Sequence, residues 1–239
     1  MTWAFPYIYG MILVTGGTGL VGSHLLAKLI ETEKNVRAIY RSVEKLNIPK
    51  KIFSYYFQEN TDFYFSKIEW VQADITDIPA LTVAFQEITH VYHCAGFISF
   101  DLSEEKKLRK INIEGTANVV NLCISFQVQK LCHVSSIATL GKSISGKKIN
   151  EESYFEQTKN NSFYSISKFG AEMEVWRGSQ EGLDVLIVNP GIIIGPGIWD
   201  SGSGLLFQKV WKGLRFHFPK TTGFVAVEDV VKTMMMLME

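Results

Sequence analysis

Apolar residues fall in short, nearly continuous runs along the chain, separated by longer segments in which they recur at helical spacing. The runs are MILVT at 11–15, VRAIY at 36–40, IEWVQ at 68–72, HVYHCA at 90–95, KLCHVSS at 130–136 and DVLIVNP at 184–190. Strands that are apolar at successive positions are typical of sheets covered on both faces, and the helices between them supply right-handed crossovers. The pattern therefore predicts an α/β fold built on a doubly wound parallel sheet.

Two segments fall outside this alternation. Residues 47–67, NIPKKIFSYYFQENTDFYFSK, are polar and aromatic, and could either pack as a helix on the domain edge or help to cover a ligand. Aromatic clusters are ordinary core material, which favours the packed helix. Residues 1–10 precede the first run, and their alternating aromatic residues permit a short edge strand.

Composition excludes several classes of protein. Lys plus Arg and Asp plus Glu both number 24, so there is no basic surplus to neutralise a nucleic-acid backbone. Cys94, Cys123 and Cys132 lie in apolar contexts without the close pairing of a zinc site or redox dithiol, so we expect reduced core residues and no metal. No run approaches the roughly 20 apolar residues of a membrane span, and no secretory signal pattern is present. We therefore expect a cytoplasmic protein without a membrane span.

A glycine-rich turn follows the first predicted strand. Residues 17–22 satisfy GxGxxG, and Gly16, Gly19 and Gly22 also satisfy the wider GxxGxxG spacing. Glycine allows both the tight turn and the close approach of a phosphate, and the N-terminus of the next helix offers free amides and a favourable dipole. The turn, including Leu20 and Val21, therefore predicts a dinucleotide pyrophosphate site.

Arg41 stands at the end of the second predicted strand. A cofactor with an unphosphorylated ribose would usually meet Asp or Glu here, accepting from the 2′-hydroxyl. Arginine instead favours a 2′-phosphate, with Ser42 as a possible helper. The sequence therefore predicts NADP(H) in preference to NAD(H).

Tyr164 and Lys168 are four residues apart in FYSISK, and a helix would place both on one face. The pKa of free tyrosine is about 10, too high for a good base near neutrality. An ammonium beside the phenol would stabilise the phenolate. The pair therefore predicts an acid–base catalyst working with the cofactor.

Several motifs occur together in a characteristic order: TGGTGLVG, Asp74-Ile75, HCAG, NIEGTANVV, SSIATLG, YSISK and NPGIIIGPG. From Met11 to about Asp229 the chain resembles the extended short-chain dehydrogenase/reductase superfamily, with its Rossmann fold. Within that superfamily it looks most like the branch of dihydroflavonol reductases, aldehyde reductases and hydroxysteroid dehydrogenases, often described as NAD-dependent epimerases/dehydratases.

The resemblance implies roles for individual residues. Asp74 and Ile75 would contact the adenine, and Lys168 would also hold the nicotinamide ribose. Ser136 would hydrogen-bond the substrate oxygen, with Ser135 as the alternative. Asn112 would have a supporting role or be a plain helix residue. The remaining cofactor contacts would come from Ala95, Gly96, Pro190, Gly191, Ile192 and Ile193.

These roles imply an NADP(H)-dependent oxidoreductase that transfers hydride between nicotinamide and a carbonyl or secondary alcohol of a small molecule. A nucleotide-sugar epimerase would use the same residues and remains open. A sugar dehydratase is disfavoured, because SSIATLG replaces the Thr-Asp-Glu that such enzymes often carry. A non-enzymatic dinucleotide sensor is a further alternative, although such relatives usually lack the tyrosine and lysine.

The division into domains follows from the same motifs. We expect a nucleotide-binding domain at 11–190 and a partial substrate lobe at 191–239, either truncated or unusually small. Asp229 is expected to cap the last helix. The superfamily often dimerises through helices corresponding to 103–126 and 162–181, which implies a homodimer. An apolar substrate pocket is predicted from the aromatic residues Trp199, Phe207, Trp211, Phe216 and Phe218, with His217 as a further contact or a surface residue.

Overall fold

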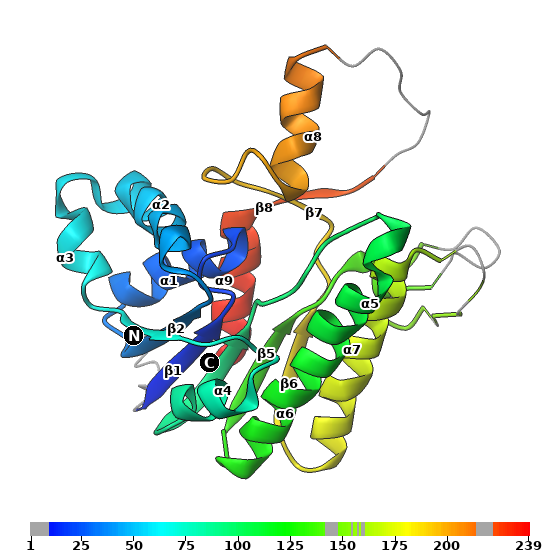
Figure 1. Ribbon diagram of the computed structural model, residues 1–239, viewed down its shortest axis with the longest axis horizontal. Coiled ribbons are helices and arrows are strands. Elements are labelled where there is room, and N and C mark those ends of the chain that lie inside the picture. The colour runs from blue at the N-terminus through cyan, green and yellow to red at the C-terminus, as the bar shows by residue number, and fades with distance from the viewer. Residues whose placement is uncertain (1–9, 142–147, 154, 157, 159–160, 214–221) are drawn as a thin grey trace, which may run out of the picture.

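A computed structural model describes residues 10–141, 148–153, 155–156, 158, 161–213 and 222–239 (Figure 1). Residues 1–9 of the predicted leader at 1–10 lie outside the described residues, as do the predicted pocket residues Phe216, His217 and Phe218. The strands are β1 Met11–Thr15, β2 Val36–Tyr40, β3 Glu69–Gln72, β4 Ile88–His93, β5 Lys130–Val134, β6 Asp184–Val188, β7 Ile192–Ile194 and β8 Phe224–Ala226. The helices are α1 Leu20–Glu31, α2 Asn47–Phe57, α3 Thr61–Phe65, α4 Ile78–Ala84, α5 Glu105–Leu108, α6 Gly115–Ser125, α7 Phe163–Gln180, α8 Gly202–Trp211 and α9 Val227–Met238.

Six parallel strands form the central sheet, in the order β3-β2-β1-β4-β5-β6. The predicted doubly wound parallel sheet is therefore confirmed. The order reverses at β1, since the chain proceeds outward through β2 and β3 and then returns to place β4 on the other side of β1. Ligands of such sheets bind beyond the carboxyl ends of the strands at the point of reversal.

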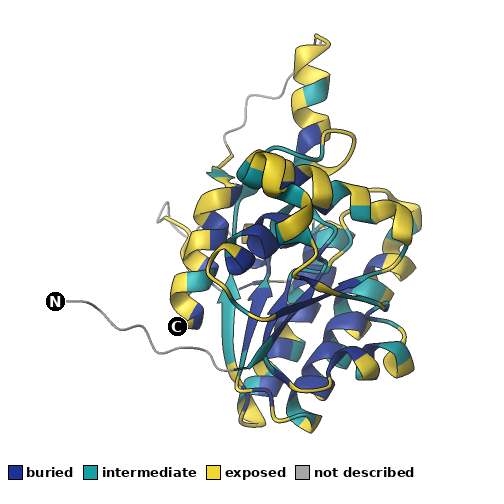
Figure 2. Cartoon of the chain, turned by 90° about the vertical axis from the view of Figure 1, so that its left-hand side faces the viewer, coloured by how far each residue is buried: buried dark blue, intermediate teal, exposed yellow. Residues whose placement is uncertain are grey.

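Each face of the sheet has its own hydrophobic core. On β1, Ile12 and Val14 face the core under α1 and α9, whereas Leu13 between them faces the core under α4, α6 and α7. Successive residues of a strand point to opposite faces, so both faces must be apolar. Figure 2 shows the resulting buried sheet between more exposed helices. This explains why the strands are continuous apolar runs in the sequence.

The aromatic segment forms α2 and α3, packed against α1. Phe53 is fully buried in the core, and its ring contacts those of Phe57 and Phe65 at 5.4 and 5.5 Å between centroids. The packed-helix interpretation of this segment therefore agrees with the structure.

The predicted helix at 103–126 is divided. A 3-10 turn at 102–104 leads into α5, a π-helical turn spans 109–114, and α6 continues to Ser125. Asn112 lies in the π-helical turn and is buried. Such turns are frequently found at functional sites, because they redirect a side chain without ending the helix.

The three cysteines are free thiols in the protein interior. Cys123 and Cys132 are buried and Cys94 is half-buried, and burial raises the pKa of all three. Their prediction as reduced core residues agrees with this environment.

Beyond the sheet, β7 and β8 pair in parallel and carry α8, which projects above the carboxyl edge (Figure 1). The chain then returns as α9, which packs against α1, β5 and β6. Ala226 is the N-cap of α9, and Asp229 lies within its first turn, so the predicted cap at Asp229 is wrong. A carboxylate in the first turn still interacts favourably with the helix dipole. Within the described part of the chain, no helix has the length and apolar character needed to cross a membrane.

Candidate active site

The glycine-rich turn sits directly against the segment that follows β4. Gly16 has φ +70°, and a Cβ on it would lie 2.6 Å from the backbone nitrogen of Ala95. A Cβ on Gly22 would collide with the carbonyl oxygen of Gly16, and the amide of Gly19 donates to that same oxygen at 2.9 Å. Side chains are therefore excluded from the turn by backbone contacts.

The N-terminus of α1 is open to an anion. Its N-cap, Gly19, provides no side-chain hydrogen bond, and the first turn contains no acidic residue. The leading amides, which belong to residues such as Leu20 and Val21, are the unpaired donors that a helix presents to phosphate.

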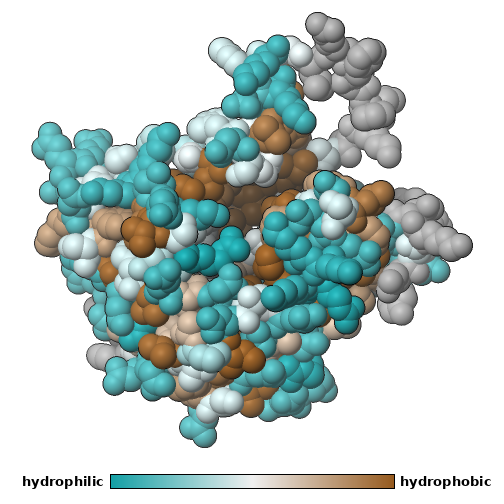
Figure 3. Space-filling model, viewed as in Figure 1, coloured by the Kyte–Doolittle hydropathy of each residue, from teal (hydrophilic) through white to brown (hydrophobic). Residues whose placement is uncertain are grey.

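A cleft of about 420 Å³ runs from this turn across the reversal point of the sheet. Seven of the predicted cofactor residues line it: Gly16, Gly19, Arg41, Asp74, Ile75, Ala95 and Gly96. Figure 3 shows hydrophobic side chains gathered in a hollow below α8, between the side of the molecule formed by α2 and α3 and that formed by α5 and α7.

The end of the cleft beyond β2 carries two cations. Arg41 Nη1 lies 3.8 Å from Asp74 Oδ2, while Asp74 Oδ1 accepts from the amide and hydroxyl of Thr76, both at 2.8 Å. Lys45 lines the same cleft from the short helical turn after β2. The arrangement offers a guanidinium and an ammonium to a phosphate group.

Other predicted cofactor residues lie outside the lining of this cleft. Gly22 follows Leu20 and Val21 in the first turn of α1. The segment from Pro190 through Gly191 to Ile192 and Ile193 connects β6 to β7, and the carbonyl of Pro190 accepts from the amide of Ile137 at 3.0 Å. This segment therefore lies beside the turn that carries Ser136.

The Ser136 side chain is near enough to the Tyr164 hydroxyl to lower the pKa of that phenol. Ser136 is also the N-cap of the 3-10 turn at 137–139, where its Oγ accepts from the amide of Ala138 at 3.1 Å. Ser135 Oγ is buried, with no hydrogen-bond partner among the described residues. Of the two serines, Ser136 is the one that meets the tyrosine.

The predicted stabilisation of the Tyr164 phenolate by Lys168 stays a prediction. Burial raises the pKa of the phenol by more than Ser136 lowers it. The Lys168 ammonium donates to the carbonyl of Val134 at 2.9 Å and lies 3.4 Å from His133 Nε2. Lys168 is only 5% exposed, and burial lowers its pKa to about 8. Tyr164 and Lys168 both lie on α7, as their spacing predicted, but the Lys168 side chain is directed toward His133 and the Val134 carbonyl of β5.

Two buried histidines extend the surroundings of Lys168. The rings of His93 and His133 lie on neighbouring strands with centroids 5.0 Å apart, and burial lowers both pKa values, that of His93 to about 3. His93 bonds the hydroxyls of Thr15 and Thr116 at 2.7 and 2.9 Å. Because both imidazoles are neutral, Lys168 is the cation of this cluster.

Asn112 joins the segment after β4 to α7. Its Oδ1 accepts from the amide of Phe97 at 2.7 Å, and its Nδ2 donates to the carbonyl of Phe97 and to Ser167 Oγ, both at 2.9 Å. These bonds agree with a supporting role. They fix the wall of the cleft next to the helix that carries Tyr164 and Lys168.

A second cleft, of about 600 Å³, opens beside Tyr164. The ring of Phe100 lies 5.6 Å from that of Tyr164 and is exposed. The lining consists of Ser99, Phe100, Asp101, Leu102, Thr158, Asn161, Ser162, Phe163 and Ile166. The aromatic residues predicted to form the substrate pocket, Trp199, Phe207 and Trp211, are exposed and line neither of the two clefts described.

Sequence reasoning missed Lys45, Phe100 and Asp200 as cleft residues. Lys45 had a local signal, because it follows Arg41 by four residues in a turn-forming segment. Phe100 and Asp200 had none, since long connections bring them to the site. Among the described residues, no group of three or more His, Cys, Asp or Glu could hold a metal ion.

The cleft at the reversal point fits a nicotinamide dinucleotide. The uncapped α1 terminus suits the pyrophosphate, and Asp74 lies at the end of the cleft beyond β2 and β3. Gly96 lies at the other end, where a Cβ would be 4.0 Å from Lys168 Nζ and 3.6 Å from Asn112 Oδ1. Gly96 therefore lies between the cleft that it lines and the buried ammonium of Lys168.

Comparison with known proteins also indicates a family that binds a nicotinamide dinucleotide. A model of the NAD dependent epimerase/dehydratase family matches residues 12–239. Tetraketide alpha-pyrone reductase 2 of Arabidopsis thaliana is 28% identical over 241 residues, covering 95% of this chain and 73% of the relative. The chain spans 50% to 73% of the lengths of three curated relatives that it matches.

Two solved structures illustrate the likeness in fold. Yeast methylglyoxal/isovaleraldehyde reductase complexed with NADPH superposes with a TM-score of 0.77 at 21% identity, covering 94% of this chain and 73% of the other. UDP-glucose 4-epimerase of Thermus thermophilus in complex with NAD gives 0.73 at 25% identity, covering 95% and 73%. The chain therefore belongs to the NAD-dependent epimerase/dehydratase family, within the extended short-chain dehydrogenase/reductase superfamily.

Proposed function

We propose that the protein is an NADP(H)-dependent oxidoreductase that interconverts a carbonyl and a secondary alcohol of a small apolar molecule. The observation that carries this proposal is the proximity of Ser136 to the Tyr164 hydroxyl, together with a cleft suited to the cofactor and a second cleft, partly apolar, next to Tyr164. A nicotinamide bound in the first cleft supplies or accepts the hydride.

Tyr164 gives a proton to the substrate oxygen during reduction and removes it during oxidation. Because burial raises its pKa, the phenol is protonated at neutral pH and ready to act as the acid. Ser136 donates a hydrogen bond to the same oxygen as negative charge develops there. Lys168, released from the Val134 carbonyl, would hold the nicotinamide ribose and bring positive charge toward the phenol.

The preference for NADP(H) rests on the two cations at the end of the first cleft. Arg41 and Lys45 both line this end of the cleft and could contact a 2′-phosphate there. Asp74, which lies 3.8 Å from Arg41, would face the adenine. The acidic residues that line this cleft are Asp74 and Asp200. A 2′-phosphate would give Lys45 an anionic partner on the cofactor, which an unphosphorylated ribose would not.

The lining of the second cleft favours a carbonyl reductase over a nucleotide-sugar epimerase. Phe100, Leu102, Phe163 and Ile166 offer apolar contact to a substrate. Among the lining residues that the structure describes there is no Lys or Arg, and Asp101 is the charged residue. A nucleotide sugar carries two phosphates, which an acidic and apolar wall would repel.

A non-enzymatic sensor is less consistent with the site, because such a protein has no need of a serine placed beside the Tyr164 hydroxyl.

A homodimer remains part of the proposal. Met173 and Trp176 on α7 are 42% and 48% exposed, and α7 packs beside α6 to give a helical surface with apolar side chains.

Tyr164→Phe should lower the reduction rate by about 100-fold or more, because it removes the proton donor but keeps the ring. NADPH affinity should change little. Turnover of a panel of aldehydes and ketones, with NADPH binding measured in parallel, checks this prediction. Full activity in the variant would exclude Tyr164 as the acid.

Substituting the two serines separately tests their roles. Ser136→Ala should reduce kcat by roughly 10- to 100-fold with cofactor affinity nearly intact, since the lost hydrogen bond acts on the developing oxyanion. Ser135→Ala should keep kcat within a few-fold, because its hydroxyl lacks a described partner. The reverse order of effects would assign the reaction to Ser135.

Replacing Arg41 and Lys45 together by Ala should weaken NADPH binding by about 10- to 100-fold and leave NADH binding nearly unchanged, because only NADPH has a 2′-phosphate. Lys50→Ala is a matched control, since Lys50 lies on α2 and pairs with Asp62 at 2.8 Å away from the cleft. Dissociation constants from equilibrium titrations give the comparison. Equal weakening for the two cofactors would contradict the assignment of the 2′-phosphate site.

A further inference from the structure

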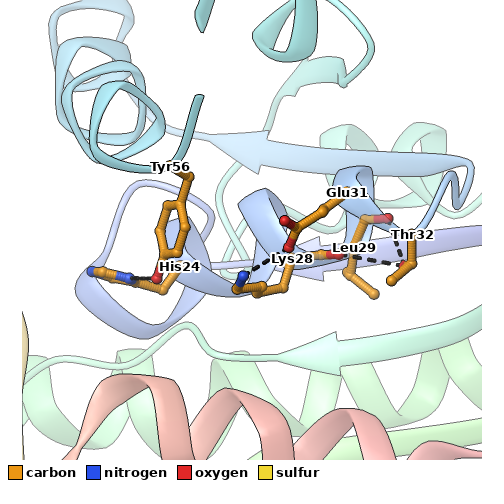
Figure 4. Close-up of polar contacts among 6 residues, drawn as sticks. All are labelled: His24, Lys28, Leu29, Glu31, Thr32 and Tyr56. Atoms are coloured by element: carbon orange, nitrogen blue, oxygen red, sulfur yellow. Dashed lines mark hydrogen bonds and ion pairs between the residues drawn. The ribbon is translucent and has the colours of Figure 1, made fainter. Parts of the chain in front are cut away.

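A buried polar contact joins three parts of the chain that are far apart in sequence. His24 lies on α1 and is 0% exposed. Its Nδ1 is 2.6 Å from the hydroxyl of Tyr56 on α2, and its Nε2 is 3.0 Å from the carbonyl oxygen of Pro196, after β7. Figure 4 shows Tyr56 reaching from α2 to the edge of the His24 ring, with centroids 5.5 Å apart.

These partners determine the protonation of the imidazole. The Pro196 carbonyl can only accept, so Nε2 carries the hydrogen and donates it. Burial lowers the pKa of His24, so the ring is neutral near pH 7 and Nδ1 is an acceptor for the Tyr56 hydroxyl. Tyr56 therefore stabilises the tautomer that bonds Pro196. In the other tautomer the lone pair of Nε2 would face the lone pairs of the carbonyl.

The turn at 195–197 also packs closely against α2 and α9. Gly197 has φ +121°, and a Cβ there would lie 2.5 Å from Ile52 Cγ1 of α2. A Cβ on Gly195 would collide with Val227, the first residue of α9, and would lie 3.7 Å from His24 Nε2. The turn thus has close packing on both glycines and one buried hydrogen bond between them, at Pro196.

The residues immediately after this turn form a wall of the proposed cofactor cleft. Ile198, Asp200 and Ser201 line that cleft together with Gly19 of the phosphate-binding turn. Ile48, on the same helix as Tyr56, lines it as well. A shift of the turn would therefore move this wall relative to α1.

We propose that His24 and Tyr56 are positioning residues, which fix the turn at 195–197 and thereby hold the segment 198–201 against a bound dinucleotide. The inference rests on the proposed function, since it assumes that the cleft binds the cofactor. It gives the aromatic segment a role in cofactor binding at a distance: Tyr56 on α2 stabilises the tautomer of His24 that donates to the Pro196 carbonyl, and His24 itself contacts neither cofactor nor substrate.

Tyr56→Phe tests the tautomer directly, because it keeps the ring and removes the hydroxyl. It should raise the dissociation constant and the KM for NADPH by about 3- to 10-fold, the range for loss of one hydrogen bond, with kcat within about twofold. Tyr55→Phe is the matched control: Tyr55 is the preceding residue on α2 and is 50% exposed. Binding is followed by fluorescence titration with NADPH, and folding by thermal denaturation.

Two substitutions at His24 separate positioning from packing. His24→Leu should weaken NADPH binding at least as much as Tyr56→Phe, because it leaves the Pro196 carbonyl unpaired. In His24→Gln the side-chain amide can donate to that carbonyl and should restore most of the affinity. If His24→Leu fails to fold, His24→Gln and Tyr56→Phe still give the result.

The inference is overturned if Tyr56→Phe binds NADPH like Tyr55→Phe, or if a folded His24→Gln binds as weakly as His24→Leu. Failure of the proposed function would look different, because the unmodified protein would then bind neither NADPH nor NADH, and the inference would be overturned with it.

Discussion

The close approach of two backbone segments at the centre of the sheet is the constraint on which the site depends. Gly16 turns against the nitrogen of Ala95, so that the phosphate-binding turn and the segment after β4 share one narrow edge. Only residues without side chains permit this contact. Because the strand order reverses there, helices on the two faces of the sheet start from the same edge, and the open terminus of α1 faces the cleft at that edge.

The end of this edge near Lys168 contains buried polar groups that lower the stability of the fold. The Lys168 ammonium is buried, and both His133 Nδ1 and Ser135 Oγ are buried without partners among the described residues. Unpaired buried polar groups destabilise a protein by about 1–3 kcal/mol each. Two of the four such atoms among the described residues, His133 Nδ1 and Ser135 Oγ, lie on or directly after β5, the strand whose Val134 carbonyl holds Lys168. The neutral His93 and His133 leave Lys168 as the cation available to the site.

The sequence was informative where a local pattern determines structure. Continuous apolar runs located the strands, because both faces of the sheet are covered, and the glycine spacing located the tight turn before α1. The direction of Lys168 could not be predicted, because it depends on the Val134 carbonyl of a distant strand and on burial. The position of Phe100 beside Tyr164 could not be predicted either, because it lies in a long connection without a recognisable pattern. The aromatic residues of α8, Phe207 and Trp211, were predicted to form a substrate pocket but are exposed and line neither cleft. Sequence alone does not separate the two cases, because an exposed helix face and a pocket wall can have the same composition.

A crystal structure of the protein with NADP⁺ tests the account most directly. We expect the pyrophosphate on the first amides of α1, the 2′-phosphate within reach of Arg41 and Lys45, and the nicotinamide between Tyr164 and the segment 190–193. The Lys168 ammonium should leave the Val134 carbonyl and bond the ribose. A dinucleotide bound away from the glycine-rich turn, or no binding at saturating concentration, would contradict the proposed site and function together.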